Sequence, residues 1–200
     1  MSAAVLRWHN PGWAAAMPSR QPGHRIWPTA VRGTEYNALR DRDHESWNVL
    51  FDQEAPAIYR YALSRLGDAG LAEEATSDVF EAAWKGAESY TDRGLPARAW
   101  LFGIARHVVA SQQRRWRRRA PQISIDAYVE SGQSESPDDR LDLVRAIAAL
   151  TAAHAEVINL RFLQGLSLAE TAQVLNVTTD AVKGRQLRAL EALRRELGEP

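Results

Sequence analysis

The chain has 200 residues, 45% of them hydrophobic, and its 25 basic and 25 acidic side chains balance to a formal net charge of zero. This length suits one or two small domains, each with a hydrophobic core, and the absence of cysteine excludes disulfides and thiolate metal sites. No apolar run approaches the roughly 18 residues that a membrane helix needs, so we expect a soluble, cytoplasmic protein without membrane insertion.

Residues 1–44 contain four of the nine prolines and show no sustained hydrophobic period. We expect a flexible N-terminal extension. Three interpretations stay open: an assigned start that lies too far upstream, with Val31 as the true start, a tail without a role, or an arm that binds a partner.

Residues 45–119 are predicted to form a first domain of three amphipathic helices. The apolar stripes occupy residues 47–66, 71–84 and 100–109. Gly67 and Gly70 break the first helix, and a loop precedes the third. Three helices of this kind can close one small core.

Charge is segregated along this domain. Nine acids and three bases lie between Glu45 and Glu88, whereas six arginines and no acid lie between Arg106 and Arg119. The two surfaces indicate different partners: a polyanion for the basic one, and either a protein or only solvent for the acidic one.

Residues 120–137 are rich in serine, proline and acids and are predicted to be a mobile linker. From residue 138 to 200 helical periodicity resumes, including an apolar stripe that contains Val157, Ile158, Leu160 and Phe162. No strand pattern is found, so the predicted fold is all-α, with two small helical domains joined by a flexible linker.

The segment 166–190 has the pattern of a helix-turn-helix. Ala172 allows close approach of two helices, Asn176 can adopt the left-handed conformation of the turn, and Val182 fills the angle between them. Thr178 can cap the second helix. This helix is basic, and its cationic residues are Lys183, Arg185, Arg188, Arg194 and Arg195. A basic second helix favours insertion into a DNA groove.

Two sequence blocks occur in tandem. The first is WLFGIAR at 100–106, and the second is the terminal segment AEVINLRFLQGLSLAETAQVLNVTTDAVKGRQLRALEALRREL. Together they resemble the extracytoplasmic-function (ECF) class of bacterial sigma factors, in the sigma-70 family, over residues 45–197. The resemblance implies a subunit that directs RNA polymerase to promoters. Residues 45–119 would be region 2, which binds core polymerase and the −10 element, and residues 138–200 would be region 4, which binds the −35 element.

The resemblance also implies partners and contact residues. Region 2 would dock on a coiled coil of the polymerase's largest subunit, and region 4 on the flap of the second-largest; an anti-sigma factor that clamps the two domains is a further candidate partner. The implied polymerase contacts are Glu74, Ser77, Asp78 and Phe80. Ser77 stands where the family usually has glutamine. Alternatively, this acidic helix face contacts only solvent.

The implied −10 contacts lie on the third helix: Arg106, His107, Ser111, Arg114, Arg115 and Trp116. In the family this helix and the preceding loop, here 90–97, hold the non-template strand and a flipped base, onto which Trp116 could stack. Trp100 is expected in the core. His107 and Ser111 replace a common asparagine and aspartate, and Arg117–Arg119 could be only a nonspecific phosphate grip.

The implied −35 contacts lie on the last helix: Thr179, Lys183, Gly184, Leu187 and Arg188. Lys183 and Arg188 would bind base edges or phosphates, and Leu187 a thymine methyl group. Gly184 stands where serine is common. Gln186 replaces a usual apolar residue, and we expect it to loosen packing against the first helix of the motif.

The sequence has no metal-ligand spacing, phosphate-binding glycine loop or nucleophile motif, so neither enzyme activity nor a cofactor or metal is expected. Two other functions stay open. A stand-alone helix-turn-helix regulator would dimerise on a symmetric duplex site. An interaction protein would use the basic helix to bind RNA or an acidic partner.

Overall fold

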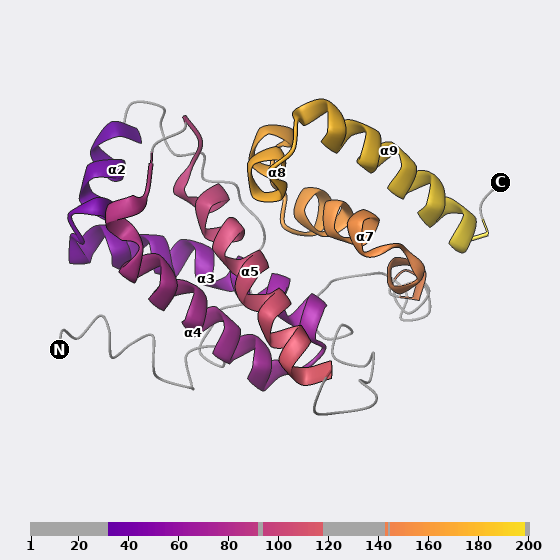
Figure 1. Cartoon of the computed structure of the whole chain (residues 1–200), viewed down its shortest axis with the longest axis horizontal. Helices are drawn as coiled ribbons and strands as arrows, with labels where there is room; N and C mark the ends of the chain where they lie inside the picture. The colour runs from indigo at the N-terminus through magenta and orange to yellow at the C-terminus, as the bar shows by residue number, and fades with distance from the viewer. Residues whose placement is uncertain (1–31, 92–93, 118–142, 144, 199–200) are drawn as a thin grey trace.

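The computed structural model describes residues 32–91, 94–117, 143 and 145–198, and every regular element in these ranges is a helix (Figure 1). The elements are α2 (Arg32–Arg40), α3 (His44–Leu66), α4 (Ala69–Lys85), η3 (Ala87–Ser89), α5 (Ala97–Arg117), α7 (Ala152–Ile158), η5 (Asn159–Leu163), α8 (Leu168–Leu175) and α9 (Thr179–Glu196). The prediction of an all-α fold with two helical units is confirmed. The expected linker, 120–137, lies outside the described residues.

Helix α3 begins and ends at residues suited to cap it. The Asp43 carboxylate accepts a hydrogen bond from the backbone N–H of Ser46 at 2.9 Å, and Gly67 ends the helix with a φ of 70°, which glycine adopts without steric cost. Gly70, expected to break the helix together with Gly67, lies instead in the first turn of α4. Gly67 and Asp68 therefore separate the two helices, and only the first of the two predicted glycines breaks α3.

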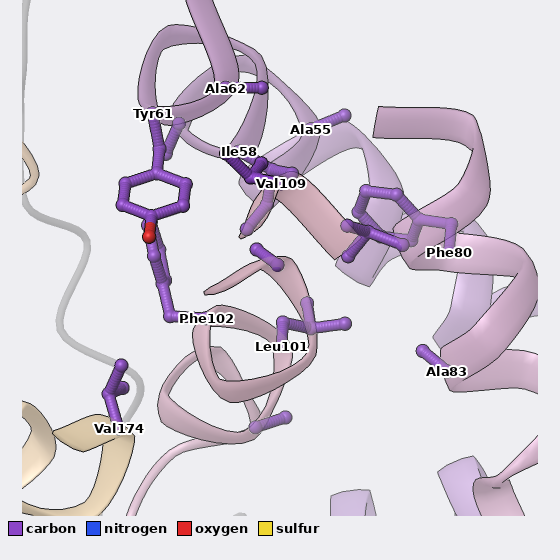
Figure 2. Close-up of a cluster of buried hydrophobic side chains, with 14 of the residues drawn as sticks. Ala55, Ile58, Tyr61, Ala62, Phe80, Ala83, Leu101, Phe102, Val109 and Val174 are labelled. Carbon is purple, nitrogen blue, oxygen red and sulfur yellow. The ribbon is translucent and has the colours of Figure 1, made fainter. Parts of the chain in front are cut away.

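The core of the first unit contains aromatic rings among aliphatic side chains (Figure 2). Phe51 and Phe80 meet edge to face with ring centroids 4.8 Å apart, and Tyr61 and Phe102 do so at 5.6 Å. Such pairs add about 0.5–1.5 kcal/mol each beyond the burial of their apolar area. These contacts tie α3 to α4 and α5, so α5 is presented on a rigid support.

The residues just before α3 belong to the first unit, which corrects the expectation that 1–44 is a flexible extension. Leu39 on α2 is 1% exposed, and its carbonyl accepts a hydrogen bond from Trp47 Nε1 at 2.9 Å. Tyr36 lies 5.2 Å from Tyr90 between ring centroids. The nine-residue α2 is too short to show a clear period, and it is stabilised by tertiary contacts. Residues 1–31 lie outside the described residues.

The second unit contains a π-helical turn directly after α7. The backbone N–H of Gln164 donates to the carbonyl of Asn159, five residues back, at 2.9 Å. The wider turn shifts the residues after it around the helix axis. Phe162, which the predicted apolar stripe includes, lies within this turn and is 51% exposed, while Leu160 is fully buried. This part of the predicted stripe was wrong.

The two units contact each other through α5 and α8, which lie side by side in Figure 1. Val174 on α8 is 4% exposed and belongs to the same buried cluster as Phe102 on α5 (Figure 2). In the ranges that the structure describes, no helix is long and apolar enough to cross a membrane.

Candidate nucleic-acid interface

The helix-turn-helix predicted at 166–190 is formed by α8 and α9. The Ser167 hydroxyl accepts from the backbone N–H of Glu170 at 3.2 Å, and the Glu170 carboxylate accepts from the backbone N–H of Ser167 at 2.7 Å. This capping box satisfies two backbone donors at the start of α8. Asn176 ends α8 in the left-handed conformation, with φ 52° and ψ 51°, as expected for the turn.

Helix α9 begins after Thr178, whose hydroxyl accepts from the backbone N–H of Ala181 at 3.1 Å. Val182 and Ala189 are fully buried and fix one face of α9 against the rest of the second unit. Because a helix turns about 100° per residue, Gln186 lies on the same side as Val182, whereas Lys183, Leu187 and Arg188 face outward. The burial of Val182 and the cap at Thr178 were both predicted from the sequence.

The structure gathers the predicted −35 residues along the outward face of α9. Thr179, Lys183, Leu187 and Arg188 are exposed, and Gly184 is half-buried. Leu187 is 61% exposed, an unusual position for a large apolar side chain on an otherwise polar face. Lys183 Nζ lies 3.1 Å from Asp180 Oδ1; an exposed pair of this kind contributes little and leaves the amine available to a phosphate.

Gly184 leaves room beneath the Arg188 side chain. A Cβ added at Gly184 would meet only the Arg188 guanidinium, with the nearest atom at 3.6 Å, an ordinary van der Waals distance. No steric reason therefore requires glycine at this position.

We expect Gly184→Ala to raise the free energy of unfolding by up to about 1 kcal/mol, because glycine disfavours a helix interior. Gly103→Ala in α5 is a matched control, since an added Cβ there meets no atom within 4 Å. Urea denaturation of both variants measures the change, and a lower midpoint for the Gly184 variant alone would show that glycine is needed in the fold.

Gln186, which was expected to loosen the packing of α9, has a polar partner in the structure. Its Oε1 accepts a hydrogen bond from Arg161 Nε at 3.0 Å, and Arg161 Nη1 also donates to the carbonyl of Leu166. Arg161 thus links the turn before α8 to the centre of α9. The polar residue at this usually apolar position is explained by its hydrogen-bond partner, 25 residues away.

The predicted −10 residues divide between two faces of α5. His107, Arg114 and Arg115 are exposed, and Ser111 and Trp116 are half-buried. His107, Ser111 and Arg114 follow one another at spacings of four and three, so they form one stripe. Arg106 instead lies in line with Phe102 and Arg98, four and eight residues earlier. The side chain of Arg117 and the whole of Arg118 and Arg119 lie outside the described residues.

Trp100, expected in the core, packs against it while remaining partly accessible. Its ring stacks on Tyr90 at 4.5 Å between centroids and meets Trp47 edge-on at 6.4 Å. Tyr90 begins the loop that the resemblance places beside the non-template strand; residues 92–93 of that loop lie outside the described residues. The aromatic pair anchors both ends of this loop to the core.

The predicted polymerase contacts on α4 are only partly on the surface. Glu74 is exposed, and Ser77 and Asp78 are half-buried; Asp78 Oδ2 accepts a hydrogen bond from Gln112 Nε2 at 3.3 Å. Phe80 is fully buried against Phe51. This corrects its placement among the docking residues, because a ring inside the core cannot form part of a surface.

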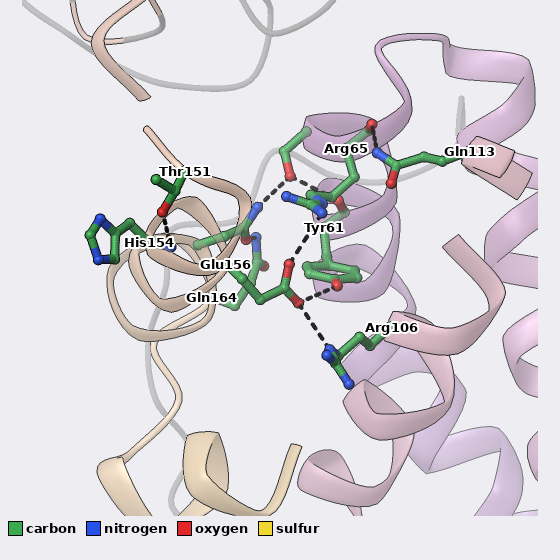
Figure 3. Close-up of polar contacts among 10 residues, drawn as sticks. Tyr61, Arg65, Arg106, Gln113, Thr151, His154, Glu156 and Gln164 are labelled. Carbon is green, nitrogen blue, oxygen red and sulfur yellow. Dashed lines mark hydrogen bonds and ion pairs between the residues drawn. The ribbon is translucent and has the colours of Figure 1, made fainter. Parts of the chain in front are cut away.

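A buried carboxylate that the sequence did not single out joins the two units (Figure 3). Glu156 on α7 is 6% exposed. Its Oε1 accepts a hydrogen bond from Tyr61 Oη at 2.7 Å and lies 4.0 Å from Arg106 Nε, and its Oε2 lies 3.5 Å from Arg65 Nη2. The only signal in the sequence is an acid directly beside the apolar Val157 and Ile158.

Tyr61 is suited to donate to this carboxylate. Burial, together with the neighbouring Glu156 charge, raises the pKa of Tyr61 well above its usual value. The hydroxyl therefore stays protonated, and it can supply a hydrogen bond to Glu156 throughout the physiological pH range.

Comparison with known proteins identifies the family. Residues 50–120 match the model for sigma-70 region 2, and residues 146–195 match that for sigma-70 region 4. The ECF RNA polymerase sigma factor SigL of Mycobacterium tuberculosis is 37% identical over 157 residues, which cover 76% of this chain and 88% of SigL. The chain belongs to the ECF sigma factors. It is a promoter-recognition subunit of RNA polymerase, as the sequence resemblance predicted.

A second relative is also an ECF sigma factor, and two solved structures share the fold. SigD of Mycobacterium bovis is 34% identical over 180 residues, covering 84% of this chain and 80% of SigD. The fold resembles that of CnrH, solved with the cytosolic domain of CnrY, at a TM-score of 0.64, 22% identity and coverage of 82% and 96% of the two chains. It also resembles RpoE of Bartonella quintana, at a TM-score of 0.64, 24% identity and coverage of 77% and 98%. The two matched regions correspond to the two helical units.

Proposed function

We propose that this sigma factor reads promoters with one surface in each unit: α9 binds the −35 element as duplex, and α5 with the 90–97 loop holds the −10 element as a single strand. The acidic surface of α4, including Glu74 and Asp78, docks on the coiled coil of the polymerase's largest subunit, and the second unit docks on the flap of the second-largest. The protein supplies binding free energy, and the polymerase performs the chemistry in the cytoplasm.

The observation that carries this proposal is the outward face of α9. Lys183 and Arg188 provide donors for guanine edges or phosphates, and the exposed Leu187 between them provides an apolar surface for a thymine methyl group. On a helix face that contacts only water, an exposed leucine between two cations is not expected. The combination is suited to the floor of a major groove.

The α5 surface supports the second half of the proposal. Extruding a base from the duplex costs a few kcal/mol, and stacking on an aromatic ring returns about 1–3 kcal/mol per base. Trp116 is half-exposed beside the exposed Arg114 and Arg115, so one ring and two phosphate-binding groups lie within one turn. This arrangement is suited to a melted strand.

A protein inhibitor is a further proposed partner. The solved structure of RpoE contains the anti-sigma factor NepR, and that of CnrH contains the cytosolic domain of CnrY. We extend this kind of partner to the present chain. It would act by covering the surfaces described above.

A selection experiment separates this function from the stand-alone regulator. A random pool of single-stranded and duplex DNA is incubated with the protein, with bacterial core polymerase, or with both. We expect a shared single-stranded sequence to be retained only when both are present. Retention of a two-fold symmetric duplex by the protein alone would instead support the regulator, and retention without sequence preference would support the interaction protein.

A further inference from the structure

Residues 1–31, called here the N-terminal segment, have a composition unlike that of the rest of the chain. They contain no acidic side chain, although 25 of the 200 residues are Asp or Glu, and the first acid of the sequence is Glu35. The segment has three arginines and three of the seven tryptophans: Arg7, Trp8, Trp13, Arg20, Arg25 and Trp27. The match to sigma-70 region 2 begins at residue 50, so it assigns this segment no role.

Cations interleaved with aromatic rings are suited to a single-stranded nucleic acid. The cations neutralise phosphates, and each ring can stack on a base whatever its sequence. A segment that only contacts water typically contains few aromatic residues. The composition of the N-terminal segment therefore favours a polyanionic partner with flat, accessible rings.

Helix α2 fixes the place where the N-terminal segment joins the first unit. The helix begins at Arg32 and lies against η3 (Figure 1). The Tyr36 ring lies 5.2 Å from the Tyr90 ring between centroids, and Arg40 Cζ lies 5.5 Å from the centroid of the Tyr36 ring. Tyr90 is the first residue of the loop proposed to hold the −10 strand. The segment is therefore attached beside that loop.

The residue that links α2 to the start of α3 strengthens this attachment. Arg42 donates from Nη1 to Glu88 Oε1 at 2.9 Å and from Nε to the carbonyl of Trp84 at 3.3 Å. Its φ is 56°, a conformation that is costly for a residue other than glycine and persists only where surrounding contacts hold it. These contacts keep the direction of α2 constant relative to the loop.

We propose that the N-terminal segment is a second nucleic-acid contact, in which its arginines pair with phosphates and its tryptophans stack on bases of the melted strand next to the −10 element. This inference rests on the proposed function, which it extends beyond the two matched regions. Because α2 tethers the segment beside the strand, even weak individual contacts act at a high effective concentration.

The test uses the complex of the full chain with bacterial core polymerase. The probe is the single-stranded DNA retained in the selection described above, once alone and once with a run of thymidines on each side. One variant combines Arg7→Gln, Arg20→Gln and Arg25→Gln, and a second combines Trp8→Ala, Trp13→Ala and Trp27→Ala. The matched control replaces the same three arginines with lysine. Fluorescence anisotropy measures the affinity over a range of salt concentrations.

We expect both variants to bind the flanked probe roughly five- to fiftyfold more weakly than the parent protein does, and the unflanked probe nearly as well. Loss of three phosphate contacts should lower the slope of log affinity against log salt by about 2, because each contact to a single strand contributes about 0.7. The tryptophan variant should keep the parent slope. The lysine control should keep both the slope and the affinity, since lysine binds phosphate as a point charge.

A cross-linking measurement locates the contact. The chain has no cysteine, so Ser19→Cys carries a photoactivatable cross-linker at a single site. We expect cross-links to the thymidines of the flanked probe, and none from the exposed Glu196→Cys in the second unit. Cross-links from position 19 to polymerase subunits alone would overturn the inference.

The affinities distinguish this inference from the function beneath it. Equal binding of the flanked probe by the parent and both variants would overturn the inference and leave the proposed function standing. Equal losses on the two probes would also overturn it, because the segment would then act on the polymerase and not on the flanking strand. A parent complex that binds neither probe would overturn the proposed function itself. Mass spectrometry of the protein from its source cells that shows Val31 as the first residue would overturn the inference alone.

Discussion

Replacing Arg188 with alanine will lower promoter-specific transcription by roughly ten- to a hundredfold, because a good base contact is worth about 1–3 kcal/mol of discrimination. Arg188 is exposed on the outward face of α9, so its removal leaves the fold intact. Run-off transcription from a promoter of this sigma factor, at fixed salt and limiting protein, measures the loss. The same substitution at Lys183 should act in the same direction.

The control for this prediction is Arg195→Ala, which removes an equal charge in the last turn of the same helix. A residue that contacts only phosphate should weaken binding evenly across sequences and reduce its salt dependence. A base contact should instead relax the preference at one position of the −35 element. Equal losses in the two variants, without any change in sequence preference, would contradict base reading by Arg188.

Replacing Phe80 with alanine will lower the free energy of unfolding by about 3–5 kcal/mol, the usual cost of truncating a buried aromatic ring. Phe80 is fully buried, and its ring lies 4.8 Å from that of Phe51, so the truncation leaves a cavity between α3 and α4. Urea denaturation followed by circular dichroism measures the loss. A destabilised first unit will bind polymerase poorly for this reason alone.

A charge reversal at Glu74 separates packing from docking. Glu74 is exposed on the same helix, so Glu74→Lys should leave the urea midpoint nearly unchanged while weakening the affinity for core polymerase. Phe80→Leu, which keeps most of the buried volume, should retain that affinity. A Phe80→Ala protein of normal stability that fails to bind polymerase would show that the ring, rather than the core around it, is used for docking.

Local sequence signals predicted the helix-turn-helix well. The cap at Thr178, the left-handed Asn176 and the buried Val182 each depend on neighbours within a few positions, whereas the cap at Ser167 was not predicted. Such features follow from backbone chemistry, and the outward face of α9 then follows from the helical period. The sequence was therefore sufficient to predict which face of α9 forms the candidate −35 surface.

Features determined by distant contacts were missed. Tyr61 and Glu156 are 95 positions apart, and no periodicity connects them. Leu39 is buried and its carbonyl accepts a hydrogen bond from Trp47, so α2 is held by tertiary contacts and not by its own pattern. Phe162 was predicted in the apolar stripe but lies exposed within a π-helical turn that the sequence pattern did not indicate. For Phe80, family resemblance assigned a surface role that its burial excludes.

Run-off transcription over fragments of the source genome, with bacterial core polymerase alone and with this protein added, tests the central claim most directly. The account predicts discrete new start sites preceded by two motifs at a fixed spacing, one read as duplex and one melted. New transcripts should disappear when Lys183 and Arg188 are both replaced by alanine. Duplex binding by the protein alone, without any new start site, would contradict the account.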